Sequence, residues 1–203
     1  EAREMVAGRP WSFLHISRPE VDLPEGTDPY SESVYNKAAE NLQHMIDEGV
    51  LVRDEEDSYY VYRLTMGEHV QTGLVAAASV EAYYADRIKK HEFTRPVKED
   101  DRVRQIEALN AQTGPELLVY KANTPVDESL EAVCKHSADV DVTAKDGVRH
   151  EIWVMSDTEQ VATLTEAFDA MEAIYVADGH HRSAAGSRVG NSQKAANESH
   201  TGN

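Results

Sequence analysis

One short segment, from Ala173 to Ala185, constrains the fold of this chain more than any other. It runs Ala-Ile-Tyr-Val-Ala-Asp-Gly-His-His-Arg-Ser-Ala-Ala. The apolar run with Ile and Val is typical of a buried strand, Asp-Gly is a turn signal, and the small residues that follow can begin a helix. The segment therefore predicts a strand, a tight turn and a helix in immediate succession.

The predicted turn carries groups that suit an anion. A helix N-terminus presents free N–H groups and a partial positive charge, which favour phosphate. A guanidinium adds a fork for phosphate or carboxylate, and two imidazoles add further donors. The residues of this predicted phosphate site are Gly179, His180, His181 and Arg182. In the alternative interpretation the turn is only structural and Asp178 caps the helix. Neither the Walker A spacing nor the Rossmann fingerprint is present.

A second segment with chemical potential is His91-Glu92-Phe93-Thr94. In an extended chain Glu92 and Thr94 share one face, so a carboxylate and a hydroxyl together can handle a proton or a metal-bound water. The H-E-x-x-H motif is not satisfied, because Arg95 stands where its second histidine would be. The alternative is a polar strand end in which Glu92 pairs with a neighbouring cation.

Two cations after this segment, Lys98 and Arg102, can add positive charge to a phosphate pocket. The alternative is a charged helix start, with Asp100 or Asp101 as the cap. The single cysteine, Cys134, has no histidine or acid at motif spacing, so we interpret it as an inert thiol.

Composition excludes several classes of protein. The chain has 203 residues, with 37 acids against 20 bases and a formal net charge of −17. Such a surface repels nucleic acid and anionic membranes. One cysteine cannot build a disulfide framework or a cysteine zinc site within one chain. With neither a long apolar run nor a signal peptide visible, we expect a cytoplasmic protein that does not bind a membrane. Its polar ends indicate a fragment of a longer chain.

Hairpins mixed with isolated helices predict an α+β fold, with a largely antiparallel mixed sheet and flanking helices. The expected strands are residues 11–16, 59–66, 70–80, 117–120, 140–142, 151–155 and 173–177, and the expected helices are residues 2–6, 29–48, 100–114, 157–171 and the segment after residue 179. We expect one domain over residues 1–185. Residues 186–203 are polar and poor in apolar side chains, so we expect a mobile tail.

Several segments together resemble a bacterial family known mainly as a conserved domain of unknown function. The matching pieces are Trp11-Ser12-Phe13-Leu14-His15 with Arg18-Pro19-Glu20, Gly49-Val50-Leu51, Tyr60-Val61-Tyr62, Thr72-Gly73, Lys90-His91-Glu92-Phe93-Thr94 with Lys98 and Asp101-Arg102, and Ala177-Asp178-Gly179-His180-His181-Arg182. They keep their order over nearly the whole chain.

The strand-Asp-Gly-His-His-Arg-helix element is also similar to the phosphate-binding turn of the ParB/sulfiredoxin-like superfamily, which includes free-serine kinases. Those kinases have a similar Asp-Gly-His-x-Arg turn and a separate catalytic glutamate from an earlier segment. The resemblance implies that the turn from Asp178 to Arg182 contacts nucleotide phosphates and that Glu92 is the separate glutamate. The turn has no cysteine, which disfavours sulfiredoxin chemistry. The acidic charge disfavours a DNA clamp.

The leading hypothesis is therefore a nucleotide-dependent kinase that phosphorylates a small hydroxyl metabolite such as free serine. Glu92 would accept the hydroxyl proton, and Asp178 would hold Mg²⁺ with ATP or ADP. His91, Thr94, Lys98 and Arg102 would support the site. One alternative is a regulatory protein that binds a nucleotide or phosphometabolite without catalysis. Another is a metal-dependent hydrolase that uses histidines of the two segments.

Overall fold

The contacts of the chain group it into two compact units. The computed structural model describes residues 1–197 and 199. The first unit is built from Glu1–Arg53, Val80–Val119 and the stretch from Tyr175 onward, and the second from Asp54–Ser79 and Tyr120–Ile174. The expectation of a single domain over residues 1–185 stays a prediction, and each unit is described by itself. The α+β class is confirmed.

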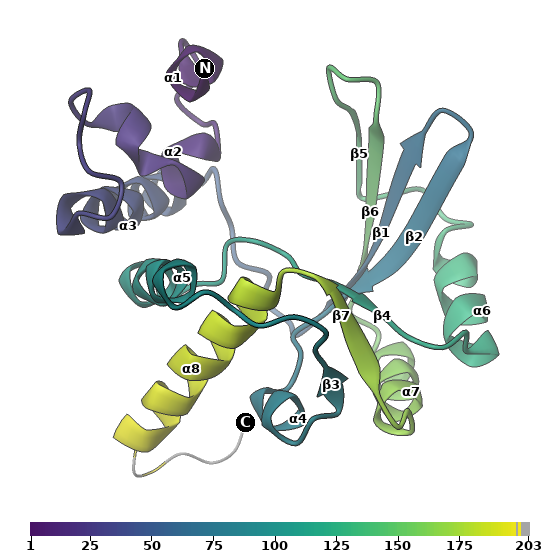
Figure 1. The fold of residues 1–203 in the computed structure, drawn as a ribbon. Coiled ribbons are helices and arrows are strands. Elements are labelled where there is room, and N and C mark those ends of the chain that lie inside the picture. The colour runs from purple at the N-terminus through teal and green to yellow at the C-terminus, as the bar shows by residue number, and fades with distance from the viewer. Residues whose placement is uncertain (198, 200–203) are drawn as a thin grey trace. The chain divides into compact units, whose positions relative to one another are not determined.

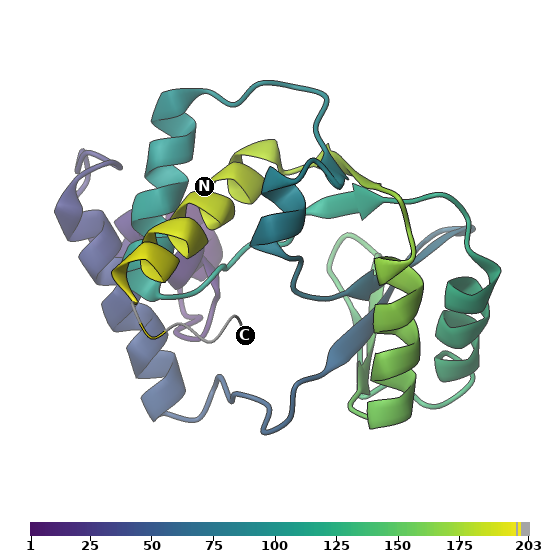
Figure 2. The ribbon, with the colours of Figure 1, turned by 90° about the horizontal axis from the view of Figure 1, so that it is seen from below.

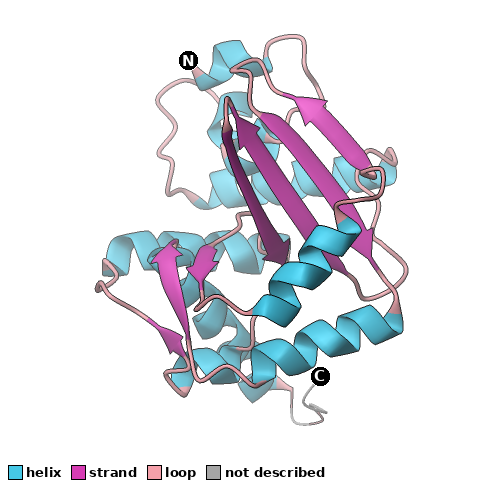
Figure 3. Cartoon of the chain, turned by 90° about the vertical axis from the view of Figure 1, so that its right-hand side faces the viewer, coloured by secondary structure: helices cyan, strands magenta, loops and turns pink. Residues whose placement is uncertain are grey.

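The first unit is mainly helical. Its elements are α1 (Ala2–Val6), α2 (Leu14–Ser17), the 3-10 helix η1 (Pro19–Asp22), α3 (Glu32–Asp47), α4 (Val80–Tyr84), β3 (Ile88–Lys89), α5 (Pro96–Leu109), β4 (Leu117–Val119), β7 (Ile174–Asp178) and α8 (His180–Ala196). The strands form a small sheet in the order β3-β7-β4 (Figure 3). Antiparallel pairing sets Leu117 opposite Asp178. The start of β4 therefore lies beside the end of β7, where the predicted turn begins.

Two apolar clusters hold the helices of this unit together. Ile16 of α2 packs with Ala38 and Met45 of α3 and with Leu109 of α5. The second cluster joins α5 to α8, which lie side by side (Figure 2). Packing on α5 therefore fixes the direction of α8 and the position of its N-terminus.

The second unit is a sheet covered on one face by helices. Its elements are β1 (Tyr59–Met66), β2 (His69–Val75), α6 (Thr124–Val133), β5 (Val140–Thr143), β6 (Arg149–Met155) and α7 (Thr158–Asp169). The antiparallel sheet has the order β2-β1-β6-β5, and both expected hairpins are present (Figure 1). Val61 and Trp153 pack with Leu130 of α6 and Leu164 of α7. The helix expected from Asp157 is confirmed, and Asp157 Oδ1 accepts from Gln160 N at 2.9 Å.

The strand predicted over residues 11–16 is wrong. Residues Leu14–Ser17 form α2, and the chain continues after Arg18 into the 3-10 helix η1. The apparent alternation misled, because Trp11 and Phe13 are both exposed and Ile16 alone reaches the core. One buried residue per turn suits a short helix as well as a strand.

Two predicted boundaries also differ from the structure. The helix expected from Asp100 or Asp101 begins at Pro96, because proline suits a first helical turn. The strand expected over residues 70–80 ends at Val75, and Val80 is the first residue of α4.

The chain after residue 185 is helical where we expected a mobile tail. α8 continues to Ala196, and Val189 is buried against Ile106 and Val103 of α5. Its small residues allow close packing: a Cβ placed on Gly190 would lie 3.0 Å from Val80 Cγ2. The low apolar content of this segment therefore reflects the small residues that let α8 pack closely against its neighbours. For residues 198 and 200–203 the expectation of a tail lies outside the described residues.

Candidate functional site

The predicted strand, turn and helix are present at the end of β7. Gly179 joins them with φ 96° and ψ 23°, a left-handed conformation that glycine adopts without strain. A Cβ on Gly179 would lie 3.3 Å from Glu116 Cα, so the turn also sits tightly against the start of β4. Asp178 Oδ1 accepts from Gly179 N at 2.8 Å. Asp178 thus bonds to the turn itself, and Gly179 occupies the helix N-cap.

His180 is the most constrained residue of the turn. Its side chain is only 3% exposed, and its Nδ1 lies 3.3 Å from Glu92 Oε1. The ring also meets the ring of His91 edge to face, with centroids 4.4 Å apart. Among the described atoms, His180 Nε2 is buried and has no hydrogen-bond partner. Buried polar atoms are nearly always paired, so this nitrogen calls for an explanation.

The segment before α5 is fastened to the turn at more than one point. His181 Nε2 accepts from Arg95 N at 3.0 Å, and Glu92 and His91 both contact His180. The structure thus brings together the two sequence segments that we singled out. Glu92 remains 56% exposed, so its carboxylate is open to a ligand while it lies beside the buried imidazole.

Thr94 lies elsewhere than we expected. Its hydroxyl donates to Glu99 Oε2 and is therefore bonded to α5 rather than to Glu92. Burial of Glu99 opposes its ionisation, but the bonds from Thr94 and Arg188 outweigh that effect and lower the pKa of its carboxyl. Thr94 therefore serves to hold the first turn of α5.

Arg182 points toward the start of β4. Its guanidinium covers Gly114, where an added Cβ would lie 1.7 Å from Arg182 Nη1, so a side chain there would displace the guanidinium. The Ser183 hydroxyl donates to the carboxylate of Glu116. Burial raises the pKa of Glu116, and the Ser183 bond and the Arg182 charge oppose that rise. Glu116 is thus a second carboxyl beside the turn.

Sequence reasoning missed Glu116, although a signal for it exists. It directly precedes β4, and β4 pairs antiparallel with β7. The residue before the start of one strand must then lie near the residue after the end of the other. The pairing partner of β7 could not be chosen from sequence, so the signal could not be used.

Both cations proposed to support the site lie on α5. Arg102 Nε donates to Asp101 at 3.0 Å, and Asp101 also accepts from the Tyr35 hydroxyl of α3 at 2.7 Å. Arg102 therefore belongs to the contact between α3 and α5. Lys98 lies exposed in the first turn of α5.

Asp178 is the residue of the turn that fits a magnesium ion. Mg²⁺ binds proteins through one or two carboxylates and keeps its remaining positions for phosphate oxygens and water. Asp178 is exposed and uses Oδ1 for the turn, which leaves Oδ2. In the part of the chain that the structure describes, no three His, Cys, Asp or Glu residues are grouped to hold an ion by themselves. A site here would therefore share the ion with a phosphate.

The chain is of the α+β class, and a glycine joins β7 to α8 at the turn described above. Over residues 1–203 the chain matches the family model described as protein of unknown function (DUF1015), and it belongs to that family. No curated protein and no solved structure matches it significantly. None of the described helices is both long and apolar enough to span a bilayer.

Proposed function

We propose that the chain is a nucleotide-dependent kinase that phosphorylates the hydroxyl of a small metabolite such as free serine. The observation that carries the proposal is the contact between Glu92 and His180. It puts an accessible carboxylate beside a helix N-terminus that suits phosphate. Phosphoryl transfer needs both a group to take the hydroxyl proton and a cradle that neutralises phosphate charge.

Each residue of the turn has its own role in this proposal. The first-turn N–H groups of α8 and Arg182 would hold phosphate oxygens, with His181 beside them. Asp178 would hold Mg²⁺, which supplies charge neutralisation when it is bound. With the His180 ring as an imidazolium, its unpartnered Nε2–H would donate to a phosphate oxygen that entered the turn.

The transfer step balances with these groups. The substrate hydroxyl oxygen forms a bond to the terminal phosphorus, and its proton passes to the Glu92 carboxylate. The bond between that phosphorus and the bridging oxygen breaks, so the nucleotide leaves with one phosphate fewer. A positioned base of this kind contributes about 100-fold to 10,000-fold in rate.

Glu92→Gln tests the role of the base. With ATP or ADP, Mg²⁺ and free serine, we expect turnover to fall at least about 100-fold, because an amide cannot accept the proton. Nucleotide affinity, measured by calorimetry, should stay within a few-fold. Glu107→Gln, an exposed glutamate of α5, is the matched control and should keep full activity.

Arg182→Ala tests the phosphate cradle, with the exposed Arg53→Ala as its control. We expect the heat-unfolding midpoint of the wild-type chain to rise with one nucleotide and this rise to disappear in Arg182→Ala. No rise with any nucleotide would remove the kinase proposal. Saturable binding without turnover that is insensitive to Glu92→Gln would instead indicate a regulatory binding protein.

A further inference from the structure

A cavity in the first unit is lined by polar groups that the proposed kinase does not use. It has a volume of about 310 Å³ and lies between the segment from Pro10 to Asp22 and one face of α3. Its polar lining residues are His15, Asp22, Lys37, Asn41 and His44. The volume is at the small end of the range for ligand pockets.

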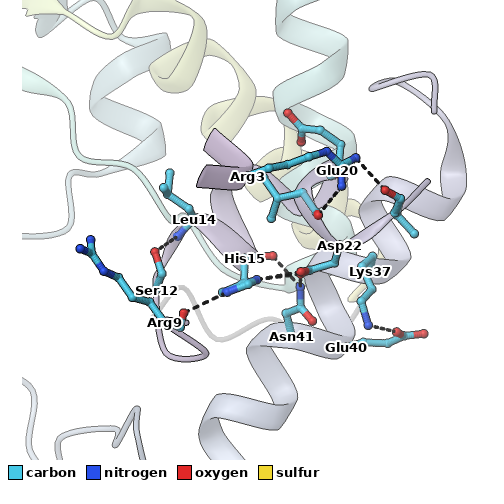
Figure 4. A network of polar contacts seen from close by, with 12 residues as sticks. Arg3, Arg9, Ser12, Leu14, His15, Glu20, Asp22, Lys37, Glu40 and Asn41 are labelled. Carbon is cyan, nitrogen blue, oxygen red and sulfur yellow. Dashed lines mark hydrogen bonds and ion pairs between the residues drawn. The ribbon is translucent and has the colours of Figure 1, made fainter. Parts of the chain in front are cut away.

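Part of this lining is a closed network of hydrogen bonds (Figure 4). His15 Nδ1 lies 2.9 Å from the Asp22 carboxylate, and His15 Nε2 lies 3.1 Å from the carbonyl of Arg9. Asn41 Nδ2 donates to the His15 carbonyl at 2.7 Å and to Asp22 at 2.8 Å. Both ring nitrogens of His15 lie within hydrogen-bond distance of acceptors, and Asp22 contacts both His15 and Asn41. This wall of the cavity is therefore cross-linked by its own hydrogen bonds.

The remaining donors lie on α3. Lys37, Asn41 and His44 are four and three residues apart and so share a helix face. Lys37 Nζ lies 3.1 Å from Glu40 and has three N–H donors in all, so others remain for a ligand. Glu40 does not line the cavity, whereas Lys37 does. The chain has a net charge of −17, yet the formally charged residues of this lining balance, with Lys37 against Asp22.

We propose that this cavity binds a small metabolite with an oxyanion head, either a carboxylate or a phosphate ester. The Lys37 ammonium and a ring N–H of His44 hold the oxyanion. Pro10 and Met45 contact the apolar remainder of the ligand. The saturated pair of His15 and Asp22 keeps the wall in place and excludes a second anion. This site does not depend on the proposed kinase function, because none of its residues lies in the α8 turn.

Trp11 provides a direct reporter of binding. Its ring lies against His44 with centroids 5.4 Å apart, and it is 45% exposed. The other tryptophan, Trp153, is buried in the second unit and donates to the His136 carbonyl. A ligand that bonds to His44 changes the surroundings of Trp11 and leaves those of Trp153 unchanged.

The experiment titrates the chain with inorganic phosphate and, separately, with butyrate while tryptophan emission is recorded. We expect a saturable change with at least one probe, no change in Trp11→Phe, and at least a tenfold loss of affinity in Lys37→Met. Lys145→Met, an exposed lysine of the second unit, and Arg53→Ala, an exposed arginine of the first unit, should both behave as wild type. Saturation with phosphate alone or with butyrate alone supports the proposal and identifies the head group.

Two results would overturn the proposal: no saturable change with either probe, or equal affinity in Lys37→Met and wild type. Lys37→Gln keeps much of the side-chain length and a donor but removes the charge, so it gives the same test if Lys37→Met fails to fold. Loss of the Trp11 signal in Arg182→Ala would assign the binding to the α8 turn instead. A failed kinase assay, by contrast, leaves this titration unaffected.

Discussion

Two histidines of the first unit, His15 and His180, each lie against a carboxylate, but their other ring nitrogens differ. His15 Nε2 faces the Arg9 carbonyl, so the ring is satisfied on both sides. His180 Nε2 is buried and, among the described atoms, has no partner. The carboxylates differ as well, because Asp22 is 23% exposed and Glu92 is 56% exposed.

The difference separates a structural role from a functional one. A closed network of partly buried polar groups stabilises a fold and specifies one arrangement. A network with an unpartnered polar atom leaves a hydrogen bond that a ligand can form. We therefore expect substitutions at His15 to change stability and substitutions at His180 to change binding.

His15→Leu should have the largest effect on stability. It removes the ring's hydrogen bonds to the Asp22 carboxylate and the Arg9 carbonyl, which keep only those from Asn41 Nδ2 and Ser12 N. Loss of a hydrogen bond to a charged group costs about 2–3 kcal/mol. Hydrogen exchange of α3 peptides measures this loss, and exchange there should be at least about 30-fold faster, at 1.36 kcal/mol per tenfold. His69→Leu, an exposed histidine of β2, is the control and should change stability by less than about 0.5 kcal/mol. Unchanged exchange in His15→Leu would mean that the network is not structural.

His180→Leu should have a much smaller effect on stability, within about 1 kcal/mol in either direction. It removes a buried nitrogen that has no partner, and the exposed Glu92 carboxylate can turn to water. Nucleotide affinity should nevertheless fall, because the turn loses its buried ring. Heat unfolding with and without nucleotide measures both effects. A loss of stability as large as that of His15→Leu would mean that His180 also has a structural role and that the two histidines do not differ in this respect.

The two regions also differ in how well their sequence predicted them. The strand, turn and helix around Gly179 follow from signals within about a dozen residues, and they were predicted correctly. The contact between Glu92 and His180 depends on long-range packing, so the sequence could suggest the pair but could not establish its geometry. Glu116 was missed because its position depends on which strand pairs with β7.

The N-terminal region shows the opposite problem. Trp11 and Phe13 suggested a strand, yet their side chains are exposed, and the Trp11 ring lies against His44 of α3 at an interplanar angle of 40°. Local alternation cannot distinguish a ring that faces the core from one that covers a neighbouring helix. Likewise, the small residues after Ala185 suggested a tail. Composition alone does not distinguish a tail from a helix whose small side chains allow close packing.

Glu116→Gln should have the smallest effect, visible in its dependence on pH. Burial raises the pKa of Glu116 above its ordinary value of 4.5, so the folded chain binds this proton more tightly than the unfolded chain. Stability from this group is therefore present below 4.5 and is lost as pH rises through the raised pKa. Glutamine has no proton to lose, so the variant should gain stability relative to wild type as pH rises across that window.

Glu99→Gln gives the matched control, because the pKa of Glu99 is lowered by Thr94 and Arg188 despite its burial. Its stability contribution is present above 4.5 and is lost as pH falls through the lowered pKa. Urea unfolding from acid to neutral pH should thus give slopes of opposite sign for the two variants, relative to wild type. Parallel slopes would show that the turn does not desolvate Glu116 enough to raise the pKa of its carboxyl.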